Sequence, residues 1–162
     1  MLYIRTGTGA LMGTAMFYHL TRSTPVQTLA MILPRALAQG WRVMLRGTDV
    51  AGLNRLDAQL WHGPDDGFLP HGLAGGDHDA DQPILLGTGA IGNAAQGLVL
   101  VDGADTVPDE ALGLERVWAV FYGADEAAIA KARGLWTRLT GAGMAAQYWS
   151  EEGGKWEKKA EK

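Results

Sequence analysis

The chain of 162 residues contains no cysteine, and Ser23 and Ser150 are its only serines. The lack of cysteine excludes a disulfide framework, a thiol nucleophile and a cysteine-based zinc site, and it is compatible with the cytoplasmic location that we expect. No serine elbow, P-loop or HExxH zinc motif is present. The common signatures of catalysis are therefore missing, and we expect neither a metal nor another cofactor.

Basic residues and long apolar runs are also scarce. Lys and Arg together number 14 against 18 Asp and Glu, which gives a net charge of −4. This balance argues against non-specific DNA binding as the main task, because phosphate contacts need clustered cations. No run is long and apolar enough to span a membrane, and the first 14 residues lack the apolar stretch of a signal peptide.

What remains is an alternation of strand-like and helix-like segments. A helix is expected from Pro25 to Gly40 with Thr24 as its cap, although Pro34 should kink it. Asp49 should cap a second helix that ends near Trp61. Apolar runs typical of strands occupy residues 15–20, 41–45, 83–86, 98–101, 116–122 and 144–149.

This order predicts an α/β fold, a single Rossmann-like domain with a mostly parallel central sheet and helices on both faces. We expect residues 1–14 to be a disordered leader, residues 15–150 to form the domain, and residues 151–162 to be a polar, frayed C-terminal tail. Residues 62–82, rich in Gly, Pro, Asp and His, should form a long loop. Acidic surface explains this loop better than a metal site, because a glycine-rich loop offers no fixed ligand geometry.

One glycine-rich stretch invites a nucleotide-binding interpretation. Gly87-Thr-Gly-Ala-Ile-Gly92 matches the dinucleotide fingerprint and follows a predicted strand. However, only residues 93–97 separate it from the next strand, which is too short for the helix that would hold a pyrophosphate. We therefore interpret it as an inter-strand loop, and a nucleotide-binding α/β enzyme stays the alternative hypothesis.

The segment from Ile129 to Gly143 carries a more promising pattern. At 100° per residue, Arg133 and Trp136 are neighbours on the edge of an apolar helix face, while Lys131 and Arg138 lie opposite that face. A cation beside a large apolar ring suits a ligand with a carboxylate and a hydrophobic side chain. On periodicity alone, an ordinary amphipathic helix with a solvated arginine is favoured over such a site.

A second aromatic group surrounds the end of the second predicted helix. Trp61 is followed by Phe68, Pro70 and His71 in the loop. These residues would form a protein interface if they converge on the surface, since tryptophan is a favoured anchor there. The sequence leaves a core role for Trp61 and Phe68 equally open.

Taken together, the chain resembles the chi subunit family of the bacterial DNA polymerase III holoenzyme from about Ala15 to Lys159. The resemblance rests on six elements in the same order. They are Phe17-Tyr-His-Leu20, Arg55-Leu-Asp-Ala-Gln-Leu-Trp61, Phe68-Leu-Pro-His-Gly-Leu-Ala-Gly75, Ala132-Arg133 with Trp136 and Ala142-Gly143, Gln147-Tyr-Trp149, and Gly154-Lys-Trp156.

The resemblance implies a non-catalytic accessory subunit of the clamp-loader complex with a Rossmann-like fold. Chi proteins bind the acidic C-terminal tail of single-stranded-DNA-binding protein, which ends in Pro-Phe. By this resemblance Arg133 holds the tail's carboxylate, Trp136 lines the same site, and Lys131 and Arg138 add positive charge. Trp61 and Phe68, with Pro70 and His71, correspond to the surface for the psi subunit or a helicase.

Overall fold

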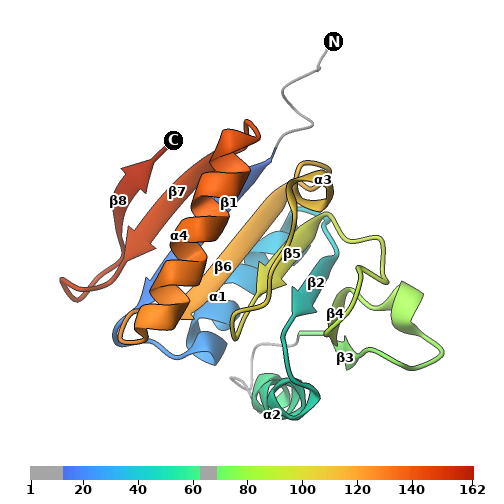
Figure 1. The fold of residues 1–162 in the computed structure, drawn as a ribbon. Helices are drawn as coiled ribbons and strands as arrows, with labels where there is room; N and C mark the ends of the chain where they lie inside the picture. Colours follow the sequence, from blue (N-terminus) through green and yellow to red (C-terminus); the bar gives the residue numbers. More distant parts are fainter. Residues whose placement is uncertain (1–12, 63–68) are drawn as a thin grey trace. The chain divides into compact units, whose positions relative to one another are not determined.

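The computed structural model describes residues 13–62 and 69–162 of the chain. Contacts divide the described chain into two compact units, which we treat separately. The first unit comprises residues 13–22 and 105–162, and the second comprises residues 23–104. Figure 1 shows the strands and helices of both units. Phe68 and the first 12 residues of the predicted leader lie outside the described residues.

The first unit is built on a sheet in which β1 runs between β6 and β7, parallel to both. The strand β8 continues this sheet on the far side of β7 and is antiparallel to it. The bounds of these strands are β1 Thr14–Leu20, β6 Arg116–Tyr122, β7 Ala145–Ser150 and β8 Glu157–Glu161.

The helix α4 (Glu126–Gly141) covers one face of this sheet (Figure 1) and packs on β6 and β7. Its buried side chains Ala132, Leu135 and Leu139 follow the helical period. The short helix α3 (Pro108–Ala111) packs beside α4. Parallel pairing places Phe17 of β1 directly beside Tyr148 of β7, so both rings point to the same face.

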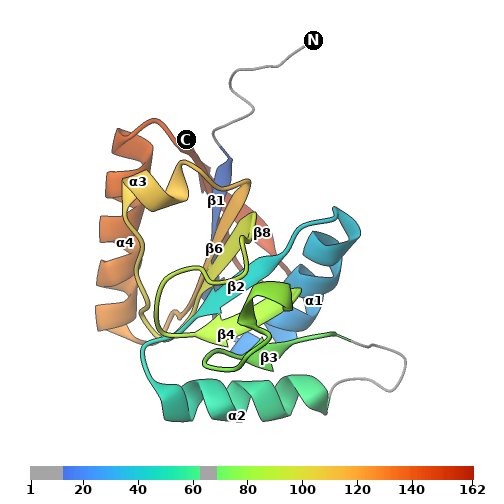
Figure 2. The same ribbon diagram turned by 90° about the vertical axis from the view of Figure 1, so that its right-hand side faces the viewer.

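The second unit also has a parallel sheet, in which β3, β4, β2 and β5 are neighbours in that order. Helices α1 and α2 pack against each other and against strands of this unit (Figure 2). The bounds are α1 Pro25–Ala38, β2 Val43–Arg46, α2 Val50–Trp61, β3 Gly72–Leu73, a 3-10 turn η2 Asp79–Asp81, β4 Ile84–Gly87 and β5 Gly97–Leu100.

Both helices of the second unit begin where the sequence predicts. The Thr24 hydroxyl accepts a hydrogen bond from the Gln27 backbone N–H, and the Gln27 side chain accepts one from the Thr24 N–H, which completes a capping box. The Asp49 carboxylate accepts hydrogen bonds from the first free N–H groups of α2. Pro34 lies inside α1 at an exposed position.

The predicted α/β class with a mostly parallel sheet is confirmed and is consistent with a Rossmann-like fold. Two local expectations are wrong. The C-terminal tail is not frayed, because residues Glu157–Glu161 pair with β7 as β8. The loop of residues 62–82 contains β3 and η2 in its described part. The domain limits at residues 15 and 150 stay predictions.

Candidate functional site

The helix α4 is the element that positions the predicted site residues. It begins at Asp125, whose carboxylate accepts hydrogen bonds from the N–H groups of Ala127 and Ala128. Its buried stripe fixes the rotation of the helix on the sheet. Consequently the residues flanking this stripe point to defined sides, with Arg133 and Trp136 on one flank and Arg138 on the other.

Trp136 packs into an aromatic cluster at the junction of α4, β1 and β7. Its ring centroid lies 5.3 Å from that of Phe17 and 6.3 Å from that of Tyr148. The rings of Phe17 and Tyr148 are stacked at 6.5 Å. Phe17 is fully buried, whereas Trp136 and Tyr148 are half-buried. The cluster therefore anchors α4 to the sheet and also presents aromatic surface.

Tyr148 carries the polar group of this cluster. Its hydroxyl lies 2.7 Å from Nδ1 of His19, and the two side chains come from neighbouring strands. The pKa of Tyr148 is raised, because burial disfavours the phenolate and the charge of Glu152 acts in the same direction. The positive charge of Arg133 opposes this shift without cancelling it. The hydroxyl thus keeps its proton at neutral pH.

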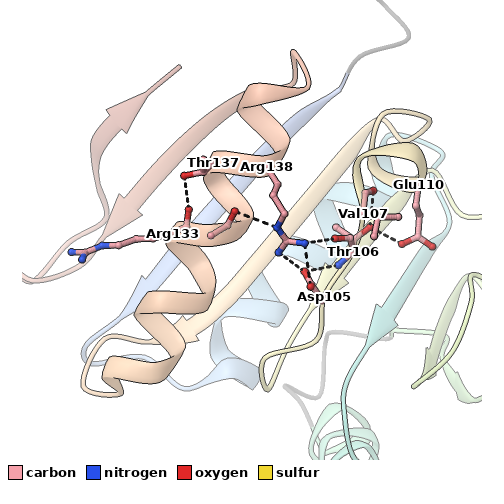
Figure 3. Close-up of polar contacts among 8 residues, drawn as sticks. Asp105, Thr106, Val107, Glu110, Arg133, Thr137 and Arg138 are labelled. Carbon is pink, nitrogen blue, oxygen red and sulfur yellow. Dashed lines mark hydrogen bonds and ion pairs between the residues drawn. The ribbon is translucent and has the colours of Figure 1, made fainter.

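Arg133 is exposed, and its side chain extends from α4 away from Arg138 (Figure 3). Arg133 lies three residues before Trp136 on α4, which puts it on the flank of the helix that faces Tyr148 of β7. Trp136 contacts the same tyrosine ring from one helical turn further along. Arg133 and Trp136 therefore share one side of α4, as their spacing predicts.

Arg138 is directed to the opposite side, where its guanidinium forms a two-pronged ion pair with Asp105 (Figure 3). The distances are 3.0 Å from Nη2 to Oδ1 and 3.3 Å from Nη1 to Oδ2. Burial raises the pKa of Asp105, but the hydrogen bond from Arg138, the backbone N–H of Thr106 and the charges of Arg138 and Lys131 outweigh it, so the pKa is lowered. Lys131 and Arg138 thus act on the Asp105 side, apart from Arg133.

The second predicted surface lies in the other unit, at the end of α2. Trp61 is 51% exposed, and its ring packs at 4.0 Å on the ring of His71, which is only 5% exposed. Nδ1 of His71 lies 2.6 Å from the carbonyl oxygen of Leu69, and Nε2 lies 3.3 Å from that of Asp57. Pro70 is half-buried beside them. Trp61 is therefore a surface residue supported by a fixed imidazole, while Phe68 lies outside the described residues.

Three other features that the sequence raises are nucleotide binding, a metal site and a membrane span, and the described residues provide no structure for them. The backbone between the end of β4 at Gly87 and the start of β5 at Gly97 forms no helix, so no helix N-terminus faces this glycine-rich loop. No group of three or more His, Asp or Glu residues in the described part of the chain could hold a metal ion. No helix within residues 13–62 or 69–162 is long and apolar enough to cross a membrane.

Phe17, His19 and Tyr148 form a group that the sequence pattern does not predict. A signal was present, because Phe17 and His19 alternate on a predicted strand and therefore share a face. What the sequence could not supply was the neighbour of that strand. Pairing of β1 with β7 brings together residues more than 125 positions apart, as the His19–Tyr148 contact shows.

α4 presents an exposed guanidinium beside half-buried aromatic rings, an arrangement whose chemistry would suit a ligand with a carboxylate and an apolar group. Comparison with known proteins identifies the family. The family model for the DNA polymerase III chi subunit, HolC, matches residues 12–147. The chain belongs to the DNA polymerase III chi subunit family.

One curated relative agrees with this assignment. The DNA polymerase III subunit chi of Pseudomonas aeruginosa is 34% identical over 76 residues, which is 45% of this chain. The match spans 52% of the length of that relative.

Proposed function

We propose that this protein is a non-catalytic accessory subunit of the bacterial replicative DNA polymerase III holoenzyme, which links the clamp loader to the acidic C-terminal tail of single-stranded-DNA-binding protein. Family membership supports the assignment to the polymerase. The observation that carries the tail-binding proposal is the exposed Arg133 beside the half-buried ring of Trp136. A tail that ends in phenylalanine offers a carboxylate to the first and an aromatic ring to the second.

Arg133 forms the centre of this surface, and Trp136 provides its apolar wall. Lys131 and Arg138 act at a distance, because their side chains belong to the flank that carries Asp105. Their charges attract the acidic tail during its approach, and such long-range attraction changes the association rate more than the lifetime of the complex. It also weakens as salt is added.

We propose that the exposed Trp61, with Pro70 and the supporting His71, holds a second protein, either the psi subunit or a helicase; Phe68 belongs to this proposal by the sequence resemblance alone. The 51% exposure of Trp61 supports this over a core role for that residue. The packing of Trp61 on His71 restricts the indole, so less conformational freedom is lost when a partner covers it. Through this surface the protein would join the clamp-loader complex while α4 holds the tail.

The test of the tail-binding proposal is calorimetric titration with an acidic peptide ending in Pro-Phe. Wild-type protein should bind, and Arg133→Ala should lose measurable binding with an unchanged thermal melt, since Arg133 is exposed. Arg35→Ala, which removes another exposed arginine in the last turn of a different helix, is the matched control and should bind normally. Equal affinity of the wild type and Arg133→Ala would refute the proposal.

A thermal-shift assay tests the nucleotide-binding alternative. A ligand present at a hundred times its dissociation constant stabilises the folded state by about 2.7 kcal/mol. We expect no shift with ATP or NAD, because the Gly87–Gly97 segment opens no helix. A shift of that size with either ligand would favour the enzyme hypothesis.

A further inference from the structure

The aromatic cluster beneath α4 contains one polar pair that packing alone does not require. Phe17, Trp136 and Phe121 surround Tyr148 with ring contacts, yet the cluster also includes His19, whose Nδ1 lies 2.7 Å from the Tyr148 hydroxyl. Both rings are half-buried, and two apolar rings would fill the same space without needing a polar partner. The pair therefore calls for a role beyond filling space.

The imidazole of His19 lies against two residues at the end of β6 and just after it. Its ring contacts that of Phe121 at 5.6 Å. It also lies against Gly123, where a Cβ atom would overlap Nε2 of His19. Gly123 is fixed by its N–H, which donates to the carbonyl of Leu20. The histidine is thus pre-positioned, and through the hydrogen bond it fixes the orientation of the Tyr148 hydroxyl.

The direction of this hydrogen bond decides what the hydroxyl can do. When Nδ1–H of His19 donates to the phenol oxygen, the hydroxyl proton of Tyr148 is left for a second acceptor. The raised pKa of Tyr148 keeps that proton in place at neutral pH. Trp136 contacts the Tyr148 ring at 6.3 Å, and Arg133 lies three residues before Trp136 on the same flank of α4, so its guanidinium attracts an anion to this side of the cluster.

We propose that Tyr148 is a specificity-determining residue of the tail site: oriented by His19, its hydroxyl donates a hydrogen bond to the terminal carboxylate that Arg133 attracts. This inference rests on the proposed function of α4 and names a further contact in the same site. It predicts that the site distinguishes a chain end from an internal acidic side chain. A hydroxyl held in one orientation adds a directed donor to the guanidinium, and two donors match the two oxygens of a terminal carboxylate better than one does.

The experiment compares two peptides, an acidic peptide ending in Pro-Phe with a free carboxylate and the same peptide with an amidated end. Their affinities are measured by fluorescence anisotropy for the wild type and for Tyr148→Phe, which keeps the ring and removes the hydroxyl. Tyr148→Phe should bind the free-acid peptide about tenfold more weakly, because a hydrogen bond to a charged group is lost. The amidated peptide should bind the wild type and the variant equally.

The control is Tyr18→Phe, which removes a hydroxyl from the neighbouring residue on the other face of β1, where the ring packs on Trp156 at 5.3 Å. It should leave both affinities unchanged. His19 is tested as a positioning residue. His19→Ala should weaken binding of the free-acid peptide about tenfold, and His19→Asn, which returns a donor near the place of Nδ1, should restore most of the affinity.

Two results would overturn the inference. One is wild-type affinity of Tyr148→Phe for the free-acid peptide, and the other is an equal loss for both peptides, which would assign the effect to packing. If Arg133→Ala fails to bind while Tyr148→Phe binds normally, the tail-binding function stands and only the role of Tyr148 falls. If the wild type binds neither peptide, the proposed function itself is refuted.

Discussion

Replacing Arg138 by alanine tests whether the two flanks of α4 have different roles, with tail contact at Arg133 and only long-range attraction at Arg138. The Arg138–Asp105 pair has good geometry, at 3.0 Å and 3.3 Å, but its side chains are 43% and 61% exposed. Exposed ion pairs contribute about 0.2–1 kcal/mol, since water screens the charges and ordering two side chains costs entropy. For a chain of this size 1 kcal/mol corresponds to about 2–4 °C. Arg138→Ala should therefore lower the melting temperature by at most about 4 °C.

The pH dependence of this effect has a definite sign. The pKa of Asp105 is lowered in the folded protein from 3.8 in its unperturbed state, so the pair stabilises the fold fully at pH values above 3.8. Its contribution is lost as the pH falls through the folded-state pKa and the carboxylate takes up a proton. Differential scanning calorimetry should show the gap between the wild type and Arg138→Ala at pH 7, and this gap should shrink at pH values below 3.8.

Tail binding by the same variant should differ sharply from that of Arg133→Ala. Because Arg138 points to the side of Asp105 (Figure 3), its loss should change the affinity for the Pro-Phe peptide by less than about threefold, mainly through slower association at low salt. Stopped-flow mixing at two salt concentrations separates the association and dissociation rates. A faster dissociation rate for Arg138→Ala, or a complete loss of binding, would show that Arg138 contacts the bound tail and would refute the different roles of the two flanks.

Three further predictions concern single side chains: a buried ring, a helix cap and an exposed indole. Phe17→Ala should destabilise the protein by about 3–5 kcal/mol in urea unfolding, because the ring is fully buried against Trp136; a loss under about 1 kcal/mol would contradict this packing. Asp49→Ala should cost about 1 kcal/mol by loss of the α2 cap, and Asp49→Asn, which still accepts hydrogen bonds, should cost less. Trp61→Ala should leave the melting temperature within about 4 °C of wild type, since the indole is 51% exposed, while abolishing capture of purified psi subunit on beads; undiminished capture would remove Trp61 from that surface.

The parts of the fold that the sequence predicts are those with a local physical cause. The caps Thr24 and Asp49 mark the starts of α1 and α2, because a side-chain oxygen at that place satisfies free N–H groups. The continuous apolar run of residues 116–122 coincides with β6. Helical spacing is also a local cause, so Arg133 and Trp136 could be placed on one flank of α4 from their spacing alone.

The parts that were missed depend on a partner strand or on irregular geometry. β8 has the sequence Glu-Lys-Lys-Ala-Glu, which contains no apolar alternation, and it forms a strand because β7 offers an open edge. β3 contains only Gly72 and Leu73, too few residues to leave a periodic pattern. The ion pair between Arg138 and Asp105 also joins residues 33 positions apart, which no helical spacing reveals.

The role of Arg133 in holding the tail is tested most directly by calorimetric titration of the acidic Pro-Phe peptide into three proteins: the wild type, Arg133→Ala and Arg138→Ala. Wild type and Arg138→Ala should bind with affinities within about threefold of each other, while Arg133→Ala should show no measurable heat of binding. Binding by Arg133→Ala with the affinity of the wild type would contradict the central claim that the exposed guanidinium beside Trp136 holds the tail.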